Sequence, residues 1–203
     1  MSWSPTLRFT KLMLGLYLYG FALALVVHAH IGVPPWDVFA LGISKQVGVT
    51  YGVASVIVSA LVLLAWIPLR VKPGLGTVLN AVCIGLFSDT VLPWLPELTE
   101  YWQQLTMFLA GMVLVSFATG LYISTNFGSG PRDGLMVGTQ RLTGWPFWMV
   151  RTCYEGIVLL LGWLMGGQVR EGTVIFAVCI GYLMQLSLRL FGFKLHAKPR
   201  DSD

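Results

Sequence analysis

Charged residues are scarce in this sequence. Lysine, arginine, aspartate and glutamate make up 11% of the chain, whereas they make up roughly 25% of an ordinary soluble domain. Apolar residues account for 56% of the chain, and the mean hydropathy is +0.74. This composition excludes a typical water-soluble domain and predicts an integral membrane protein.

Signatures of catalysis are also lacking. The sequence contains no Gly-x-x-x-x-Gly-Lys-[Ser/Thr] phosphate loop, no Gly-x-Ser-x-Gly elbow and no His-Glu-x-x-His zinc helix. No hydrophilic segment is large enough for an ATPase domain. We therefore expect no enzymatic activity, no cofactor and no bound metal. Any transport would be facilitated, ion-coupled or driven by a separate subunit.

Cysteine is rare, and Cys83, Cys153 and Cys179 all fall in apolar segments. A disulfide framework is not expected there. Small apolar packing is the ordinary role of such residues.

Long apolar segments predict the architecture. A membrane-spanning helix needs about 18 or more apolar residues, and six segments meet or approach this length. They are residues 12–30, 50–69, 75–95, 105–126, 145–166 and 172–190.

The basic residues predict the topology. A net charge of +4 would suit a nucleic-acid partner, but the charges fall between the spans, so we expect none. With a cytoplasmic N-terminus, the opposite side receives only Lys45 and Arg170. By the positive-inside rule, both termini then lie in the cytoplasm of a bacterial cell. The cytoplasmic side receives Arg8, Lys11, Arg70, Lys72, Arg132, Arg141, Arg189, Lys194, Lys198 and Arg200.

The sequence repeats itself after 96 residues, without a gap from Gly15 to Gly85. The ten residues from Gly76, Gly-Thr-Val-Leu-Asn-Ala-Val-Cys-Ile-Gly, return from Gly172 as Gly-Thr-Val-Ile-Phe-Ala-Val-Cys-Ile-Gly. Chance similarity between apolar segments would not keep Gly, Pro and Asp in register. The register pairs Gly32 with Gly128, Pro35 with Pro131, Asp37 with Asp133, Gly42 with Gly138 and Gly48 with Gly144.

Each copy contains three spans, so the second copy enters the membrane from the opposite side. Such copies are inverted-topology repeats, related by a pseudo-two-fold axis in the membrane plane. We therefore predict an all-α membrane protein with one repeat in residues 1–98 and the other in 99–192. A basic cytoplasmic tail follows at 193–203.

A Pro-Asp element follows the first span of each copy. Proline at the first helical position and aspartate two residues later are typical of a helix start. Glycine ends each segment, so short helices are expected over residues 35–47 and 131–143. One interpretation is an interfacial helix that lies flat, with Trp36 at headgroup depth. The other is a re-entrant helix that brings Asp37 and Asp133 toward the midplane.

Small residues recur every four positions along the third and sixth spans. This spacing places them on one helical face, where they allow close helix packing in lipid. The stripes predict packing between the halves or across a homodimer. They comprise Thr77, Ala81 and Gly85 in the third span, and Thr173, Ala177 and Gly181 in the sixth.

Ionisable residues within spans are candidates for function because a charge in hydrocarbon is costly. Arg151 and Glu155 lie four apart on one helical face, as a structural salt bridge or as part of a solute path. The first copy has Ser55 and Ser59 at the matching positions. Asp89 has no charged counterpart.

Two sequence elements carry a resemblance to a known family. They are Gly-x-Pro-Pro-Trp-Asp-Val-Phe, from Gly32, and Gly-x-Gly-Thr-Val, from Gly74. In these elements the chain resembles the bacterial YczE/YyaS/YitT group of membrane proteins. The resemblance extends to about residue 192 and implies a location in the bacterial cytoplasmic membrane. It implies no particular chemistry. Arg132 stands where the first copy has Trp36, so the two elements can differ in purpose.

We expect a small transporter or channel for an unidentified solute, with its path between the halves. The path candidates are Pro35, Trp36, Asp37, Pro131, Arg132, Asp133, Arg151 and Glu155. The alternative is a scaffold or regulatory partner that binds another protein through its cytoplasmic loops. Little loop sequence lies outside the repeat, which disfavours this alternative.

Overall fold

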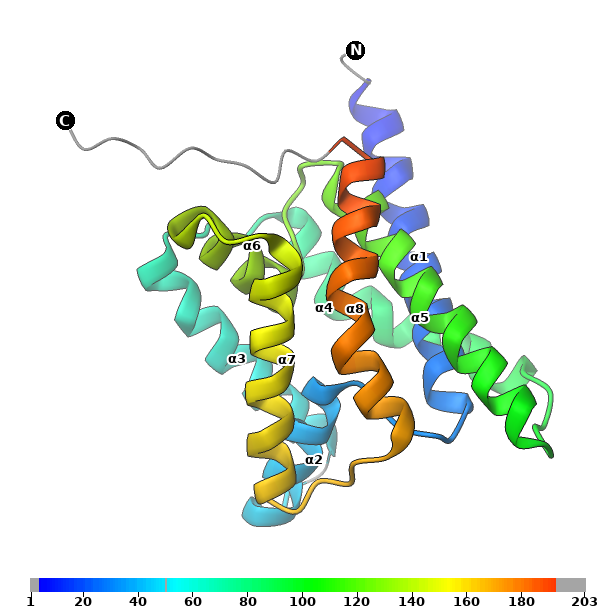
Figure 1. Ribbon diagram of the computed structural model, residues 1–203. Helices are drawn as coiled ribbons and strands as arrows, with labels where there is room; N and C mark the ends of the chain where they lie inside the picture. The colour runs from blue at the N-terminus through cyan, green and yellow to red at the C-terminus, as the bar shows by residue number, and fades with distance from the viewer. Residues whose placement is uncertain (1–3, 50, 193–203) are drawn as a thin grey trace.

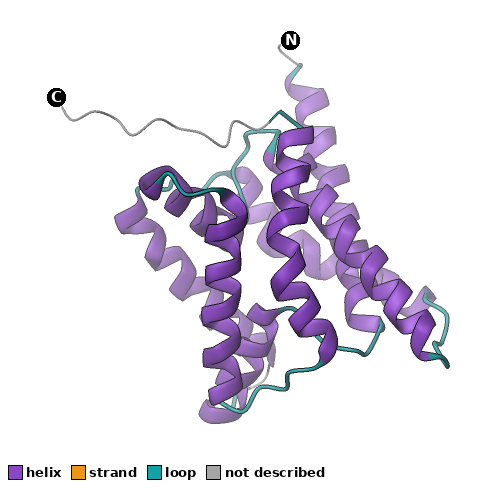
Figure 2. Cartoon of the chain, viewed as in Figure 1, coloured by secondary structure: helices purple, strands orange, loops and turns teal. Residues whose placement is uncertain are grey.

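The chain forms a bundle of helices without strands over residues 4–49 and 51–192, the part that its computed structural model describes (Figures 1 and 2). The predicted basic tail at 193–203 lies outside these residues. The elements are α1 (Pro5–His28), α2 (Pro35–Val47), α3 (Tyr51–Leu69), α4 (Leu75–Val91), the 3-10 helix η1 (Leu92–Trp94), α5 (Tyr101–Ile123), α6 (Pro131–Thr143), α7 (Phe147–Leu164) and α8 (Glu171–Leu190).

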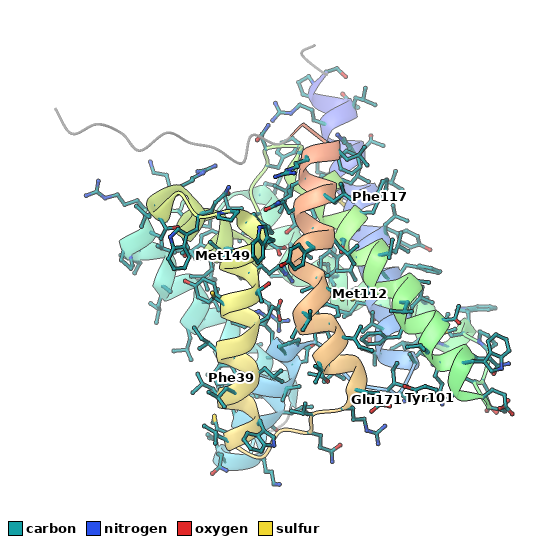
Figure 3. The ribbon with its side chains drawn as sticks, viewed as in Figure 1. Phe39, Tyr101, Met112, Phe117, Met149 and Glu171 are labelled. Carbon is teal, nitrogen blue, oxygen red and sulfur yellow. The ribbon has the colours of Figure 1, made fainter. Side chains whose placement is uncertain are left out.

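Five of these helices, namely α1, α4 with η1, α5, α7 and α8, are long and apolar enough to cross a membrane. The described apolar part of α3, Val53–Ala65, is shorter. Six spans therefore stay a prediction. Large apolar side chains project outward around the bundle (Figure 3), as expected for a surface that faces lipid.

The short helices α2 and α6 occupy the ranges that the sequence predicts. Each begins with a proline and has an aspartate in its first turn. Each ends before a glycine in the left-handed conformation, Gly48 at φ 72° and Gly144 at φ 71°. A residue with a Cβ rarely adopts this backbone, so these glycines explain why both helices stop after 13 residues.

The first helix begins earlier than the apolar pattern indicates, at Pro5 instead of residue 12. Proline suits the first helical position, and the Ser4 hydroxyl accepts a hydrogen bond from the amide of Leu7 (3.3 Å). The charged residues near the start of this helix also have interaction partners. The guanidinium of Arg8, for example, donates to the carbonyl of Thr125 at 2.7 Å.

The helices pack within and between the two copies. Helices α1 and α5, which correspond in the repeat, pack along each other. The short helix of each copy contacts a span of the other, so that α2 packs on α7 and α6 packs on α3. Figure 1 shows α2 and α6 at opposite ends of the bundle.

Backbone hydrogen bonds join the copies at matching positions. The amide of Gly76 donates to the carbonyl of Phe127 (2.7 Å), and the amide of Gly172 donates to the carbonyl of Ile31 (3.0 Å). Gly76 and Gly172 are 96 residues apart, as are Ile31 and Phe127. The start of the last helix in each copy is thus fixed to the loop before the short helix of the other.

Interlocking large and small residues explain one departure between the copies. Gly134 stands where the first copy has Val38, and a Cβ there would overlap the indole of Trp66. In the other interface Gly162 takes the place of Trp66, and a Cβ there would lie 2.8 Å from the Val38 carbonyl carbon. One interface therefore pairs Trp66 with Gly134, and the other pairs Val38 with Gly162.

Candidate functional site

The two Pro-Asp elements lie inside the protein. Trp36 is 4% exposed, and Asp37 and Asp133 are 8% and 4% exposed. Helices α2 and α6 therefore begin in the interior and run outward, to residues such as Val47, which is 62% exposed. Their buried ends carry the partial positive charge of a helix start, which stabilises the carboxylates.

Asp133 receives hydrogen bonds from two other helices. The hydroxyl of Tyr122, at the end of α5, donates to Asp133 Oδ2. The same hydroxyl accepts a hydrogen bond from the amide of Gly130 (3.0 Å). Arg151 of α7 donates from Nη1 to Asp133 Oδ1 at 3.0 Å. Tyr122 and Arg151 thus fix the start of α6 against α5 and α7.

Arg151 links two carboxylates. While Nη1 contacts Asp133, Nη2 lies 3.0 Å from Glu155 Oε1 one turn along α7. The Arg151 and Glu155 side chains are 4% and 0% exposed. Within the described residues, Oε2 of Glu155 has no hydrogen-bond partner, and Oε1 has the ion pair with Arg151 alone. Sequence reasoning left Arg151 and Glu155 open between a structural salt bridge and a solute path, and it did not predict the link to Asp133.

Asp37 pairs with the second Pro-Asp element. Arg132 Nη2 donates to Asp37 Oδ1 at 3.1 Å, and the Arg132 guanidinium lies over the Trp36 ring, 5.6 Å from its centroid. Sequence reasoning counted Arg132 among the cytoplasmic basic residues and also among the path candidates, and its side chain is 29% exposed in this contact. Trp36 and Arg132 occupy corresponding positions, so the matching ends of the two copies meet.

Two ion-pair groups therefore lie where α2, α6 and α7 come together. We call Asp37, Arg132, Asp133, Arg151 and Glu155 the buried charge cluster. It holds three carboxylates and two guanidinium groups. Breaking a buried ion pair by removing one partner typically costs about 3–5 kcal/mol. Removing one member of this cluster should therefore destabilise the folded protein.

The predicted prolines lie beside the cluster. Pro35 and Pro131 are both buried, and the carbonyl of Pro131 accepts a hydrogen bond from the indole nitrogen of Trp66 (3.0 Å). Asp89, by contrast, is exposed near the end of α4. Sequence reasoning missed Tyr122 and Trp66. The repeat did contain a signal, because their counterparts are Val26 and Gly162.

The small-residue stripes have different surroundings in the two copies. Thr173, Ala177 and Gly181 are buried, and a Cβ on Gly181 would lie 2.8 Å from the carbonyl oxygen of Trp148 in α7. Of the other stripe only Thr77 is buried, and its hydroxyl donates to the carbonyl of Ser129 (2.7 Å). Ala81 and Gly85 are exposed.

A groove lies between α3 and α4. It has a volume of about 450 Å³, and its wall is almost entirely apolar. Trp66 and Pro131 line its inner part, while Leu63, Val78 and Val82 line the sides. The groove thus reaches the first residue of α6, next to the buried charge cluster.

Comparison with known proteins identifies the family. The family described as "Family of unknown function (DUF6198)" matches residues 6–189. The chain belongs to this family. A Haemophilus influenzae protein named "Uncharacterized protein" is 37% identical, with 93% of this chain and 90% of the relative covered. No solved structure matches the chain.

Two Bacillus subtilis relatives confirm the resemblance to the YczE and YyaS group. The "Uncharacterized membrane protein YczE" is 35% identical, over 90% of this chain and 86% of the relative. The "Uncharacterized protein YyaS" is 27% identical, over 84% and 87%. With its long apolar helices, this member of the DUF6198 family is a helical, multi-pass membrane protein.

Proposed function

We propose that the protein is a small transporter of the bacterial cytoplasmic membrane, with its solute path between two halves of inverted topology. The path passes the buried charge cluster. The observation that carries this proposal is that two copies of one element, each starting with Pro and carrying Asp, meet through Asp37 and Arg132 inside an apolar bundle.

Paired contacts support the inverted arrangement. A two-fold relation makes each residue of one copy contact the other copy as its counterpart does, and the bonds of Gly76 and Gly172 follow this rule. The start of α1 and the end of α8 lie at the same end of the bundle (Figure 1). The basic residues assign that end to the cytoplasm.

The short helices fit a re-entrant arrangement. Thirteen residues give a helix of about 20 Å at about 1.5 Å per residue, too short to cross a bilayer. Their starts are buried, whereas Val47 and Leu142 near their ends are 62% and 64% exposed. A helix lying flat at the surface would expose one side along its whole length. Transporters built from inverted repeats use such half-helices to form a site near the midplane.

The cluster favours a transporter over an open channel. Glu155 lies halfway along α7 and is 0% exposed, so the inner group of Asp133, Arg151 and Glu155 is enclosed, while the Arg132 side chain is 29% exposed. A transporter encloses its site and opens it to one side at a time. Ionisable groups at such depth mark solute and ion pathways because their burial is otherwise costly.

Uptake by reconstituted protein tests the proposal. Liposomes containing the protein would be incubated with a cell metabolite extract, washed and analysed by mass spectrometry. At least one solute should accumulate with the native protein and not with the Asp37→Asn, Asp133→Asn double variant. Asp89→Asn, which removes an exposed carboxylate, is the matched control and should behave as native. Equal contents for the native protein and the double variant would contradict the proposal.

A further inference from the structure

The carboxylates of the buried charge cluster outnumber its cations. Arg132 pairs with Asp37, and Arg151 is shared by Asp133 and Glu155. The side chains of the cluster therefore carry one more negative charge than positive charge. The helix starts of α2 and α6 stabilise Asp37 and Asp133, but Glu155 lies in the middle of α7, where burying an excess charge is costly and a bound cation or proton would offset it.

The surroundings identify Glu155 as the group that lacks a full set of partners. Asp133 accepts hydrogen bonds from Arg151 and Tyr122 and lies at a helix start. Asp37 also lies at a helix start and accepts a hydrogen bond from Arg132. Glu155 lies in the middle of a helix, its Oε1 shares Arg151 with Asp133, and in the described part of the chain its Oε2 has no hydrogen-bond partner.

The neighbouring charges leave this imbalance in place. The charged groups that act on Glu155 are Arg151 of its own helix, Asp37 of α2, and Arg132 and Asp133 of α6. Helix α8 also packs on α7. Its charged side chains, Glu171 and Arg189, lie at the two ends of α8.

The space around Glu155 favours a proton over a metal ion. The side chain is completely enclosed. Within residues 4–49 and 51–192, no three His, Cys, Asp or Glu side chains converge closely enough to hold a metal ion. A proton needs one oxygen and no cavity. With the proton on Oε2, Oε1 can still accept from Arg151 Nη2, 3.0 Å away.

We propose that Glu155 binds an exchangeable proton and that this proton couples solute movement to the proton gradient. The inference deepens the proposed function and rests on it for the coupling step. With the proton bound, two carboxylates balance two guanidinium groups. When the proton leaves to water on one side, the cluster gains one negative charge, which favours a cationic group of the solute.

Infrared spectroscopy tests the proton site without any transport. Difference spectra of proteoliposomes between acidic and alkaline buffer should contain a band from a protonated carboxyl group. This band should shift when glutamate is labelled with ¹³C at its carboxyl carbon, but not when aspartate is. It should disappear in Glu155→Gln, which keeps the size of the side chain, and persist in Asp89→Asn.

The proposal is overturned if the native protein shows no such band at any pH, if aspartate labelling shifts it, or if Glu155→Gln retains it. The isotope experiment uses native protein, so a missing band or a band shifted by aspartate labelling overturns the proposal even if the variant does not fold. Loss of the band in Glu155→Gln separates Glu155 from Glu97, Glu100 and Glu171. Solute uptake without the band would reject the proton site alone. The band without solute uptake would reject the proposed function and the coupling step, and would leave the proton site.

Discussion

The α3 and α4 pair of the first copy and the α7 and α8 pair of the second occupy matching positions in the repeat. They differ in packing and in charge. Helix α7 packs against α8 and carries Arg151 and Glu155. Helix α3 has serines at both positions and leaves a groove of about 450 Å³ beside α4. The second copy therefore supplies charges and close packing, while the first supplies an apolar opening next to the same site.

This difference fits a transporter that alternates between two states. If the two copies exchange conformations during transport, α3 and α4 would pack in the second state as α7 and α8 pack in this one. The matched positions of the repeat also provide controls within one molecule. The predictions below compare such positions, in order of decreasing expected effect.

Arg151→Ala should have the largest effect. It would leave Asp133 and Glu155 buried without their shared cation, at a cost of about 3–5 kcal/mol. Ser55→Ala, at the corresponding position of α3, should change stability by less than about 0.5 kcal/mol. Thermal unfolding of both variants in the same detergent measures the contrast. Similar melting temperatures would mean that the charged pair adds nothing to the α7 site.

Gly181→Leu and Gly85→Leu test the packing difference. A side chain on Gly181 would meet the Trp148 carbonyl, whereas nothing lies within 4 Å of a Cβ on Gly85. Overpacking of this kind costs about 1–3 kcal/mol, so only Gly181→Leu should lower the melting temperature clearly. Equal losses in the two variants would show that α4 is also covered in the membrane.

Gly134→Val, which restores the residue of the first copy, should also cost about 1–3 kcal/mol through its clash with Trp66. The clash should be relieved in a Trp66→Ala background, because that truncation removes the indole. A double-mutant cycle measures this coupling. Additive losses would contradict the interlocking of Trp66 with Gly134.

Asp37→Asn should cost less than Asp133→Asn. The Arg132 side chain that pairs with Asp37 is 29% exposed, whereas the Arg151 side chain that pairs with Asp133 is 4% exposed. Partial exposure screens an ion pair and limits its contribution to about 1 kcal/mol or less. Unfolding of the two single variants compares them directly. A larger loss for Asp37→Asn would show that the pair between the copies, Asp37 with Arg132, contributes more than the pair within the second copy.

Much of the fold follows from local sequence signals. The ranges of α2 and α6 are encoded by Pro35 and Pro131 at their starts and by the glycines at their ends. The repeat singled out Asp37 and Asp133, which the structure brings into one cluster. These features depend on short-range chemistry that a single sequence displays.

The contacts between helices could not be predicted in the same way. The repeat drew attention away from Arg151 and Glu155 because the first copy has serines there, yet Arg151 contacts Asp133 directly. Arg132 was a path candidate, but its pairing with Asp37 was not predicted, because no local pattern indicates a partner 95 residues away. The groove beside α4 could not be predicted either, because the small residues have the same spacing in α4 and in α8.

Cysteine labelling from the two sides of the membrane tests most directly that the short helices enter from opposite faces and meet inside. In a background carrying Cys83→Ala, Cys153→Ala and Cys179→Ala, Val47→Cys and Leu142→Cys should each react with a bulky impermeant reagent from one side only, and from opposite sides. Trp36→Cys and Leu135→Cys should resist the reagent from both. Free reaction of the buried positions, or reaction of Val47→Cys and Leu142→Cys from the same side, would contradict this account.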